Sequence, residues 1–188
     1  MNRRCLSYPT IMLLALLLAA CQALPSREEM LTHACEANPC RQAHEIELID
    51  GEGRIQRFQV PAGPLFAGGV VSVMSGERAG LNLSESSDGR LSLQWVAPEK
   101  TSEADLVLEL NQVKVEGGHA SELRVQNRMD KALQLDLEQF PASEERFFPL
   151  AAPPIPPESR VRRHWPHTIL EIQLTGARRA GENPGREP

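Results

Sequence analysis

The sequence predicts an all-β fold, a single antiparallel β-sandwich with a proline-rich crossing segment. Apolar and polar residues alternate over most of the chain after residue 40, which is the period of half-buried strands. Turn residues separate these stretches at intervals of about 8 to 12 residues, and helical periodicity is almost absent. Seven prolines between residues 141 and 166 exclude that segment from the centre of a sheet. We expect it to cross the sandwich surface in extended form.

The strands follow in order along the chain. The first is expected at 44–49, and the turn Asp50-Gly51-Glu52-Gly53 leads into the second. A switch in the alternation of a long strand indicates a bulge near Asn111 and Gln112, and Leu170, Ile172 and Leu174 are expected to form the inner row of the last strand. The later strands are expected at 54–60, 70–75, 81–84, 91–96, 104–115, 123–125, 133–137 and 169–174, with a hairpin turn at 86–89.

The segment from Leu123 to Leu137 carries one more architectural pattern. Apolar residues alternate up to Asn127, a polar turn follows, and the alternation then resumes. This layout is similar to that of immunoglobulin-like sandwiches. The similarity implies that the Asn127 side chain caps the turn by bonding to backbone amides. We place one sandwich domain at 35–176 and expect the polar, Gly/Pro-rich tail 177–188 to be disordered.

The N-terminus has the layout of a secretory signal. Arg3 and Arg4 precede an uncharged apolar run at 11–20, which is too short to cross a bilayer. The residues Leu18-Ala19-Ala20-Cys21 resemble the lipobox of bacterial lipoproteins. The resemblance implies removal of residues 1–20 and lipidation of Cys21, and residues 21–34 then form a tether. The alternative is a plain signal peptide cleaved nearby.

The residue after the lipobox cysteine indicates which membrane holds the protein. In enterobacterial lipoproteins, aspartate at this position resembles an inner-membrane retention signal, whereas this chain has Gln22. We therefore expect a protein held at the outer membrane on its periplasmic face. Several acyl chains make such an anchor effectively permanent, because each buried methylene contributes about 0.8 kcal/mol.

Cys35 and Cys40 remain after processing as an even pair. In an oxidising compartment this pair predicts a structural disulfide, and Asn38-Pro39 supplies the turn between the two thiols. A redox pair or a metal site is the alternative, but the first favours C-x-x-C and the second needs four ligands.

Composition limits the partners. Without Arg3 and Arg4 the chain has 18 basic and 25 acidic side chains, a formal charge of −7. A net acidic domain argues against general binding of nucleic acid or of anionic membranes. Aromatic residues make up 4% of the chain, which is few for a surface that stacks on sugars or bases.

No motif for catalysis, cofactor binding or phosphate binding is present. The chain has no G-x-S-x-G sequence and no glycine-rich phosphate loop, and its paired carboxylates are typical of solvated faces. We therefore predict no catalytic residue, no cofactor, no metal ligand and no enzyme activity. His164 and His167 are three apart, but Pro166 argues against the helix that would place them on one face.

One cluster has a candidate function. Arg160, Arg162, Arg163, His164 and His167 form a basic patch on an acidic domain, and Arg178 and Arg179 follow the last strand. Such a patch can engage an anionic partner, although an ordinary solvated surface has the same composition. The leading hypothesis is a non-enzymatic, lipid-anchored accessory module of the cell envelope that binds a protein partner. The alternative is a periplasmic protein that binds a small ligand or metal ion at 160–167.

Overall fold

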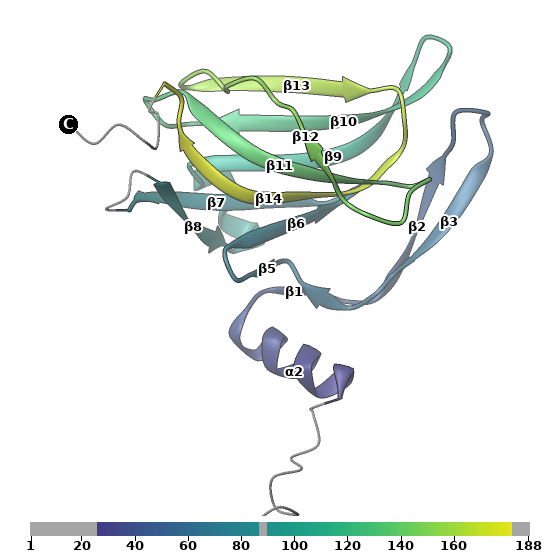
Figure 1. Cartoon of the computed structure of the whole chain (residues 1–188), viewed down its shortest axis with the longest axis horizontal. Coiled ribbons are helices and arrows are strands. Elements are labelled where there is room, and N and C mark those ends of the chain that lie inside the picture. The colour runs from purple at the N-terminus through teal and green to yellow at the C-terminus, as the bar shows by residue number, and fades with distance from the viewer. Residues whose placement is uncertain (1–25, 87–89, 182–188) are drawn as a thin grey trace, which may run out of the picture.

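The computed structural model describes residues 26–86 and 90–181 (Figure 1). Cys21, the residues around it and the tail from 182 lie outside this part, so their predicted roles stay predictions. The described chain forms an antiparallel, sandwich-like all-β fold, which confirms the predicted fold class. In the view of Figure 1, β11, β14 and β6 lie in front of β10, β9 and β7.

The main sheet has the strand order β12-β11-β14-β8-β7-β9-β10-β13, and β6 pairs with β14 and β5. Two smaller sheets, β1-β4 and β2-β3, are separate from it. The strand bounds are β1 Cys40–Arg41, β2 His44–Ile49, β3 Ile55–Val60, β4 Gly63–Pro64, β5 Phe66–Ala67, β6 Val70–Met74, β7 Arg78–Glu85, β8 Arg90–Val96, β9 Leu106–Val115, β10 Gly118–Asn127, β11 Leu133–Pro141, β12 Phe148–Leu150, β13 Ser159–Trp165 and β14 Ile169–Arg179.

The core fills the space between the two layers. Its fully buried side chains are mostly leucine, isoleucine and valine from alternate positions of β6, β7, β9, β10, β11 and β14. The 3₁₀ helix η1, Pro98–Glu103, packs on β7 at Gly80, where a Cβ atom would lie 3.1 Å from the Thr101 Cα. Glycine is therefore the residue that lets η1 approach the sheet backbone.

The polar segment before the sandwich contains a longer helix than expected. Helix α2 spans Arg27–Ala37, so it occupies much of the tether predicted at 21–34 and continues past its end. Ser26 and Glu29 form a capping box, because the Ser26 hydroxyl accepts from the Glu29 N–H and the Glu29 carboxylate accepts from the Ser26 N–H. No helix in the described part of the chain has the length and apolar character needed to span a membrane.

The predicted disulfide between Cys35 and Cys40 is present and joins the end of α2 to β1, with a Cα–Cα distance of 5.4 Å. Arg41 then ties β1 to the main sheet. Its guanidinium donates to both carboxylate oxygens of Glu77 at 2.9 and 2.8 Å and to Ser72. The disulfide therefore joins α2 to β1, and the Arg41 side chain joins β1 to the main sheet.

The proline-rich segment crosses between the layers, from β12 at one end of the strand order to β13 at the other. As predicted, the Asn127 side chain caps the turn that follows it, because its Oδ1 accepts from the Met129 N–H at 3.0 Å. The same side chain also holds the crossing segment. Its Nδ2 donates to the carbonyls of Lys131 at 2.8 Å and Pro156 at 2.9 Å.

The end of the fold differs from the prediction. Strand β14 continues to Arg179, and Ala177 is buried opposite Leu91, so the tail cannot start at 177. Leu170 is only half-buried, whereas Ile169 is fully buried, because the register shifts where β14 pairs with Phe140 and Pro141. The bulge expected near Asn111 is absent, since β9 and β10 pair without a break.

Candidate functional site

The predicted basic patch lies largely on an edge strand. Residues Ser159–Trp165 form β13, which the prolines on either side had concealed. Side chains of a strand alternate between its faces, so Arg160, Arg162 and His164 are exposed on the outer face, while Arg163 is half-buried on the inner one. The strand therefore places Arg160, Arg162 and His164 on the opposite face from Arg163.

A row of charged side chains crosses the outer face of four neighbouring strands. The register pairs Arg162 of β13 with Arg124 of β10, Arg124 with Glu109 of β9, and Glu109 with Arg78 of β7. Neighbouring strands lie about 4.8 Å apart, so these side chains are direct cross-strand neighbours. Three guanidinium groups thus share one row with one carboxylate, and Arg124 lies 3.6 Å from Glu109.

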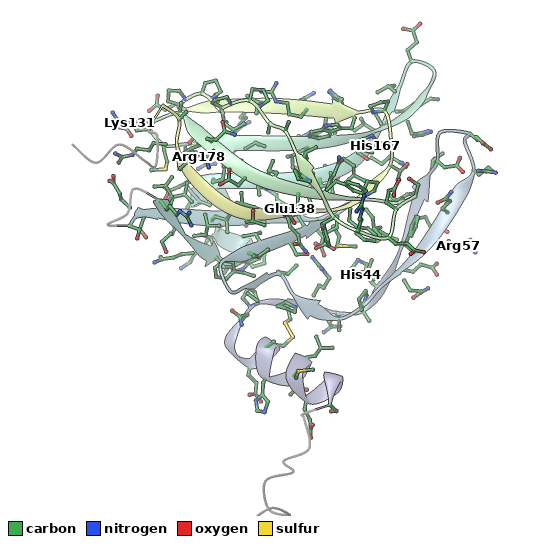
Figure 2. The ribbon with its side chains drawn as sticks, in the orientation of Figure 1. His44, Arg57, Lys131, Glu138, His167 and Arg178 are labelled. Atoms are coloured by element: carbon green, nitrogen blue, oxygen red, sulfur yellow. A yellow bond between two sulfur atoms is a disulfide. The ribbon has the colours of Figure 1, made fainter. Side chains whose placement is uncertain are left out.

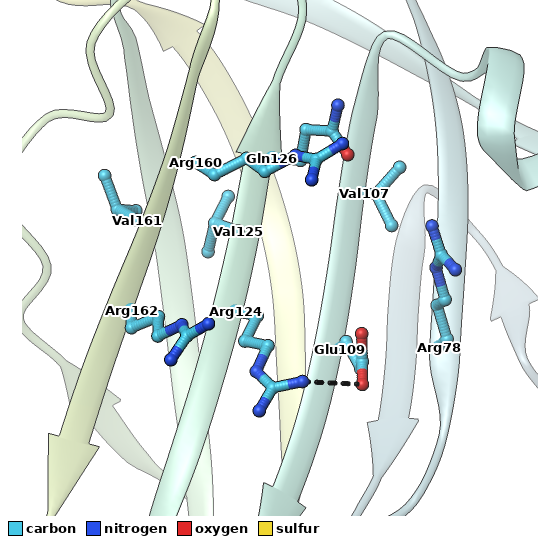
Figure 3. Close-up of a pocket in the computed structure, with 9 residues that line it drawn as sticks. All are labelled: Arg78, Val107, Glu109, Arg124, Val125, Gln126, Arg160, Val161 and Arg162. Carbon is cyan, nitrogen blue, oxygen red and sulfur yellow. Dashed lines mark ion pairs between the residues drawn. The ribbon is translucent and has the colours of Figure 1, made fainter.

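These residues line a hollow of about 420 Å³, shown in Figure 3. Arg160 joins the row from the next outward position of β13. Val107 contributes apolar surface, and Gln126 lies close to Arg160 in the same view. We call this feature the arginine hollow, and define it by Arg78, Glu109, Arg124, Arg160 and Arg162.

Most arginines elsewhere in the molecule have a partner, and those of the hollow mostly do not. Arg41, Arg54, Arg57, Arg178 and Arg179 form ion pairs with carboxylates. Among the described residues, by contrast, the side chains of Arg78, Arg160 and Arg162 form no ion pair or hydrogen bond. Three cations without partners therefore converge on one hollow that contains a single carboxylate.

A buried carboxylate holds the edge of this site in place. Glu122 of β10 is 3% exposed, and it accepts from the Arg124 Nε and, at 2.7 Å, from the His164 Nε2. Burial acts to raise the pKa of Glu122, but the hydrogen bonds from Arg124 and His164 outweigh it and lower that pKa below its ordinary value. Glu122 therefore stays ionised and fixes two side chains of the outer face.

The remaining members of the predicted patch lie elsewhere. The His167 Nε2 is 2.9 Å from Gln139 Oε1, whereas His164 contacts Glu122, so the two histidines contact different side chains. Figure 2 places His167 and Arg178 far apart along the molecule. Arg178 bonds both oxygens of Asp136 at 2.8 Å. The basic residues of the C-terminal third therefore do not form one surface.

Searches against protein-family models, curated proteins and solved structures found no match to this chain. The candidate site therefore rests on the geometry of the chain itself. Within residues 26–86 and 90–181, no group of three histidine, cysteine, aspartate or glutamate side chains is placed to hold a metal ion.

The sequence identified only part of this site. Arg160 and Arg162 belong to the predicted patch, but Arg78, Glu109 and Arg124 were not singled out. Glu109 and Arg124 lie within predicted strands, and Arg78 lies in the part of β7 that precedes the strand predicted at 81–84. Charged residues at such positions are equally typical of a strand face that is exposed to solvent. Only the pairing register brings them together, and that register joins residues up to 84 positions apart, from Arg78 to Arg162.

Proposed function

We propose that this protein is a lipid-anchored, non-enzymatic accessory module of the bacterial cell envelope that binds an acidic protein partner at the arginine hollow. The observation that carries the proposal is the convergence of Arg78, Arg160 and Arg162 without anionic partners. Like charges on neighbouring strands are destabilising unless something neutralises them. A bound anion would relieve this repulsion, so the hollow is suited to carboxylate groups.

Arginine chemistry supports this choice of ligand. A guanidinium presents five donors in a planar fork that matches a carboxylate, and such charge-assisted bonds are about twice as strong as neutral ones. The chain as a whole is acidic, with a formal charge of −7 after loss of Arg3 and Arg4. Because that field repels acidic proteins, a local basic row would select where such a partner docks.

The proposed location at the outer membrane rests on the N-terminal sequence. The lipobox-like residues Leu18 to Cys21 support lipidation of Cys21, and Gln22 supports an outer-membrane site with the domain in the periplasm. The disulfide between Cys35 and Cys40 is typical of an oxidising compartment, which agrees with export.

Binding is tested with a defined acidic probe. A fluorescent hexaglutamate peptide is titrated with the mature protein, and its anisotropy is followed at low and at physiological ionic strength. We expect binding that weakens as salt rises, and Arg162→Ala should weaken it 10- to 100-fold, as expected for loss of a charge-assisted hydrogen bond worth about 1.5–3 kcal/mol.

The matched control is Arg57→Ala. Arg57 is an exposed strand arginine that is already paired with Glu47 at 2.8 Å on the β2-β3 hairpin. This control changes the net charge equally but leaves the hollow intact. Equal losses of affinity for the peptide in both variants, or no binding by the parent protein, would exclude the hollow as the binding site.

The anchor is tested separately. The protein is expressed in a bacterial host from its full sequence, and the mature form is analysed by mass spectrometry and detergent phase partition. We expect an N-terminus at Cys21 that carries acyl chains, and recovery in the detergent phase. An unmodified thiol, or recovery in the aqueous phase, would refute lipid anchoring without affecting the binding result.

A second candidate is a small anionic ligand, as a periplasmic binding protein would take. The volume of about 420 Å³ favours it, because ligand pockets commonly measure about 300–1,000 Å³. His164 and His167 contact different acceptors, so this candidate depends on the arginines. Thermal shift with citrate and inorganic phosphate tests it, and stabilisation that Arg162→Ala abolishes would favour it over the protein partner.

A further inference from the structure

The main sheet ends in two edge strands that differ in their protection. At one end, β12 has three residues, Phe148–Leu150, with Pro149 in the middle. At the other end, β13 has seven residues, Ser159–Trp165, and contains no proline or glycine. Short length and proline are two devices that block strand addition, and only β12 has them.

One side of β13 has no strand partner in the described part of the chain. Its residues pair with β10 on one side, from Ser121 opposite Trp165 to Asn127 opposite Ser159. No strand of the described chain pairs with the other side. Figure 1 shows β13 along the upper border of the molecule, on the side opposite α2.

The side chains of β13 determine which strand would fit. Arg160, Arg162 and His164 lie on its outer face beside the arginine hollow. On the inner face, half-buried Val161 and Trp165 contact the core and flank Arg163. The Nε of Arg163 is buried, and it has no hydrogen-bond partner among the described residues.

A second copy of the chain does not fit this edge. Antiparallel self-pairing centred on Arg162 would place the two Arg162 side chains opposite each other. Like charges directly opposite each other on neighbouring strands are destabilising. An extended segment with acidic residues at alternate positions would instead form opposite-charge pairs with Arg160 and Arg162.

We propose that the protein partner adds one extended strand to the free edge of β13, with Asp or Glu opposite Arg160, Arg162 and His164. This inference rests on the proposed function and specifies how that partner docks. The intervening residues of the added strand lie on the inner row, apolar opposite Val161 and Trp165 and polar opposite Arg163. Backbone hydrogen bonds give this mode affinity, and the alternating side chains give it specificity.

The experiment uses synthetic peptides and the mature protein. The parent peptide is acetyl-Glu-Val-Glu-Thr-Glu-Val-Glu-amide, which has the expected alternation. Two derivatives carry N-methyl groups on the odd or on the even residues, which keeps every charge but removes the backbone donors of one edge. Binding is measured by fluorescence anisotropy, and protection of β13 amides by hydrogen exchange.

Strand addition predicts an asymmetric result. One N-methylated series should lose binding at least tenfold while the other binds like the parent, because an added strand uses only every second N–H. Amides on the free side of β13 should become protected. Arg162→Ala should weaken the parent peptide at least tenfold, and Arg57→Ala should not.

The other outcomes separate this inference from the proposed function. Equal behaviour of the two N-methylated series, whether both bind or neither does, overturns strand addition. If hexaglutamate still binds and Arg162→Ala abolishes that binding, the hollow remains a binding site. Failure of both hexaglutamate and the parent peptide to bind refutes the inference together with the acidic-partner function.

Discussion

Replacement of Asn127 should destabilise the fold and loosen the strand that carries the candidate site. Asn127 is 1% exposed, and its amide group joins three backbone groups on two segments. In Asn127→Ala the Met129 N–H and the carbonyls of Lys131 and Pro156 lose their partner at a partly buried site. At about 0.5–1.5 kcal/mol for each hydrogen bond, the variant should lose about 2–4 kcal/mol of unfolding free energy.

The aspartate variant tests the direction of these bonds. Asn127→Asp keeps the side-chain shape but places a carboxylate oxygen against two carbonyl oxygens, at positions where the amide donates at 2.8 and 2.9 Å. We expect it to be at least as unstable as Asn127→Ala at neutral pH. Its deficit should shrink in acid, because a protonated carboxyl regains a donor.

Urea denaturation followed by circular dichroism measures both variants, with Asn82→Ala as the control. Asn82 is an exposed residue of β7 and should change stability by less than about 0.5 kcal/mol. Thermal midpoints should fall by roughly 5–15 °C for the Asn127 variants. An Asn127→Asp protein as stable as the parent at neutral pH would refute this hydrogen-bond assignment.

Three further predictions concern packing and titration. Gly80→Ala should lose about 1–3 kcal/mol of unfolding free energy, measured by urea denaturation, because the new Cβ would lie 2.9 Å from the Thr101 Cγ2. The control is Gly51→Ala, where the new Cβ would have no heavy atom within 4 Å. Glu122→Gln should lose about 1–2 kcal/mol at neutral pH, a figure discounted for the half-exposed partners of Glu122. Because the pKa of Glu122 is lowered in the fold, the ionised carboxylate stabilises the protein at pH values above its ordinary pKa of 4.5, and this stabilisation is lost as the pH falls through the folded pKa. The urea midpoints of parent and variant should therefore converge in acid. The Asp50 carboxyl should titrate by NMR with a pKa of about 2, because the Arg54 N–H and side chain and then the Glu52 N–H bond its charged form; a midpoint near 3.8 would contradict these contacts.

Local patterns in the sequence were enough to predict most of the fold. The strand predicted at 44–49 agrees with β2 at His44–Ile49, and the one at 91–96 agrees with β8 to within one residue. Alternation works here because one face of each strand is buried against the other layer. Asn127 was predicted to cap its turn, and this also depends on contacts within a few residues.

The missed elements have identifiable causes. Helix α2 packs against little of the sandwich, so it has almost no apolar stripe, and only the capping box of Ser26 and Glu29 marks its start. Strand β13 was missed because prolines surround it and its inner row contains Arg163 between Val161 and Trp165. The candidate site was incomplete for a different reason. Its residues meet through long-range register, which no local pattern contains.

Strand β14 has a consequence for when the sandwich can form during synthesis and transport. It pairs with β11 along one side and with β6 and β8 along the other, so it closes the gap between three strands made earlier. Until residues 169–179 are available, those three strands lack a shared neighbour and the core stays open to water. Because β14 lies near the end of the sequence, we expect the sandwich to complete its folding only when most of the polypeptide is available.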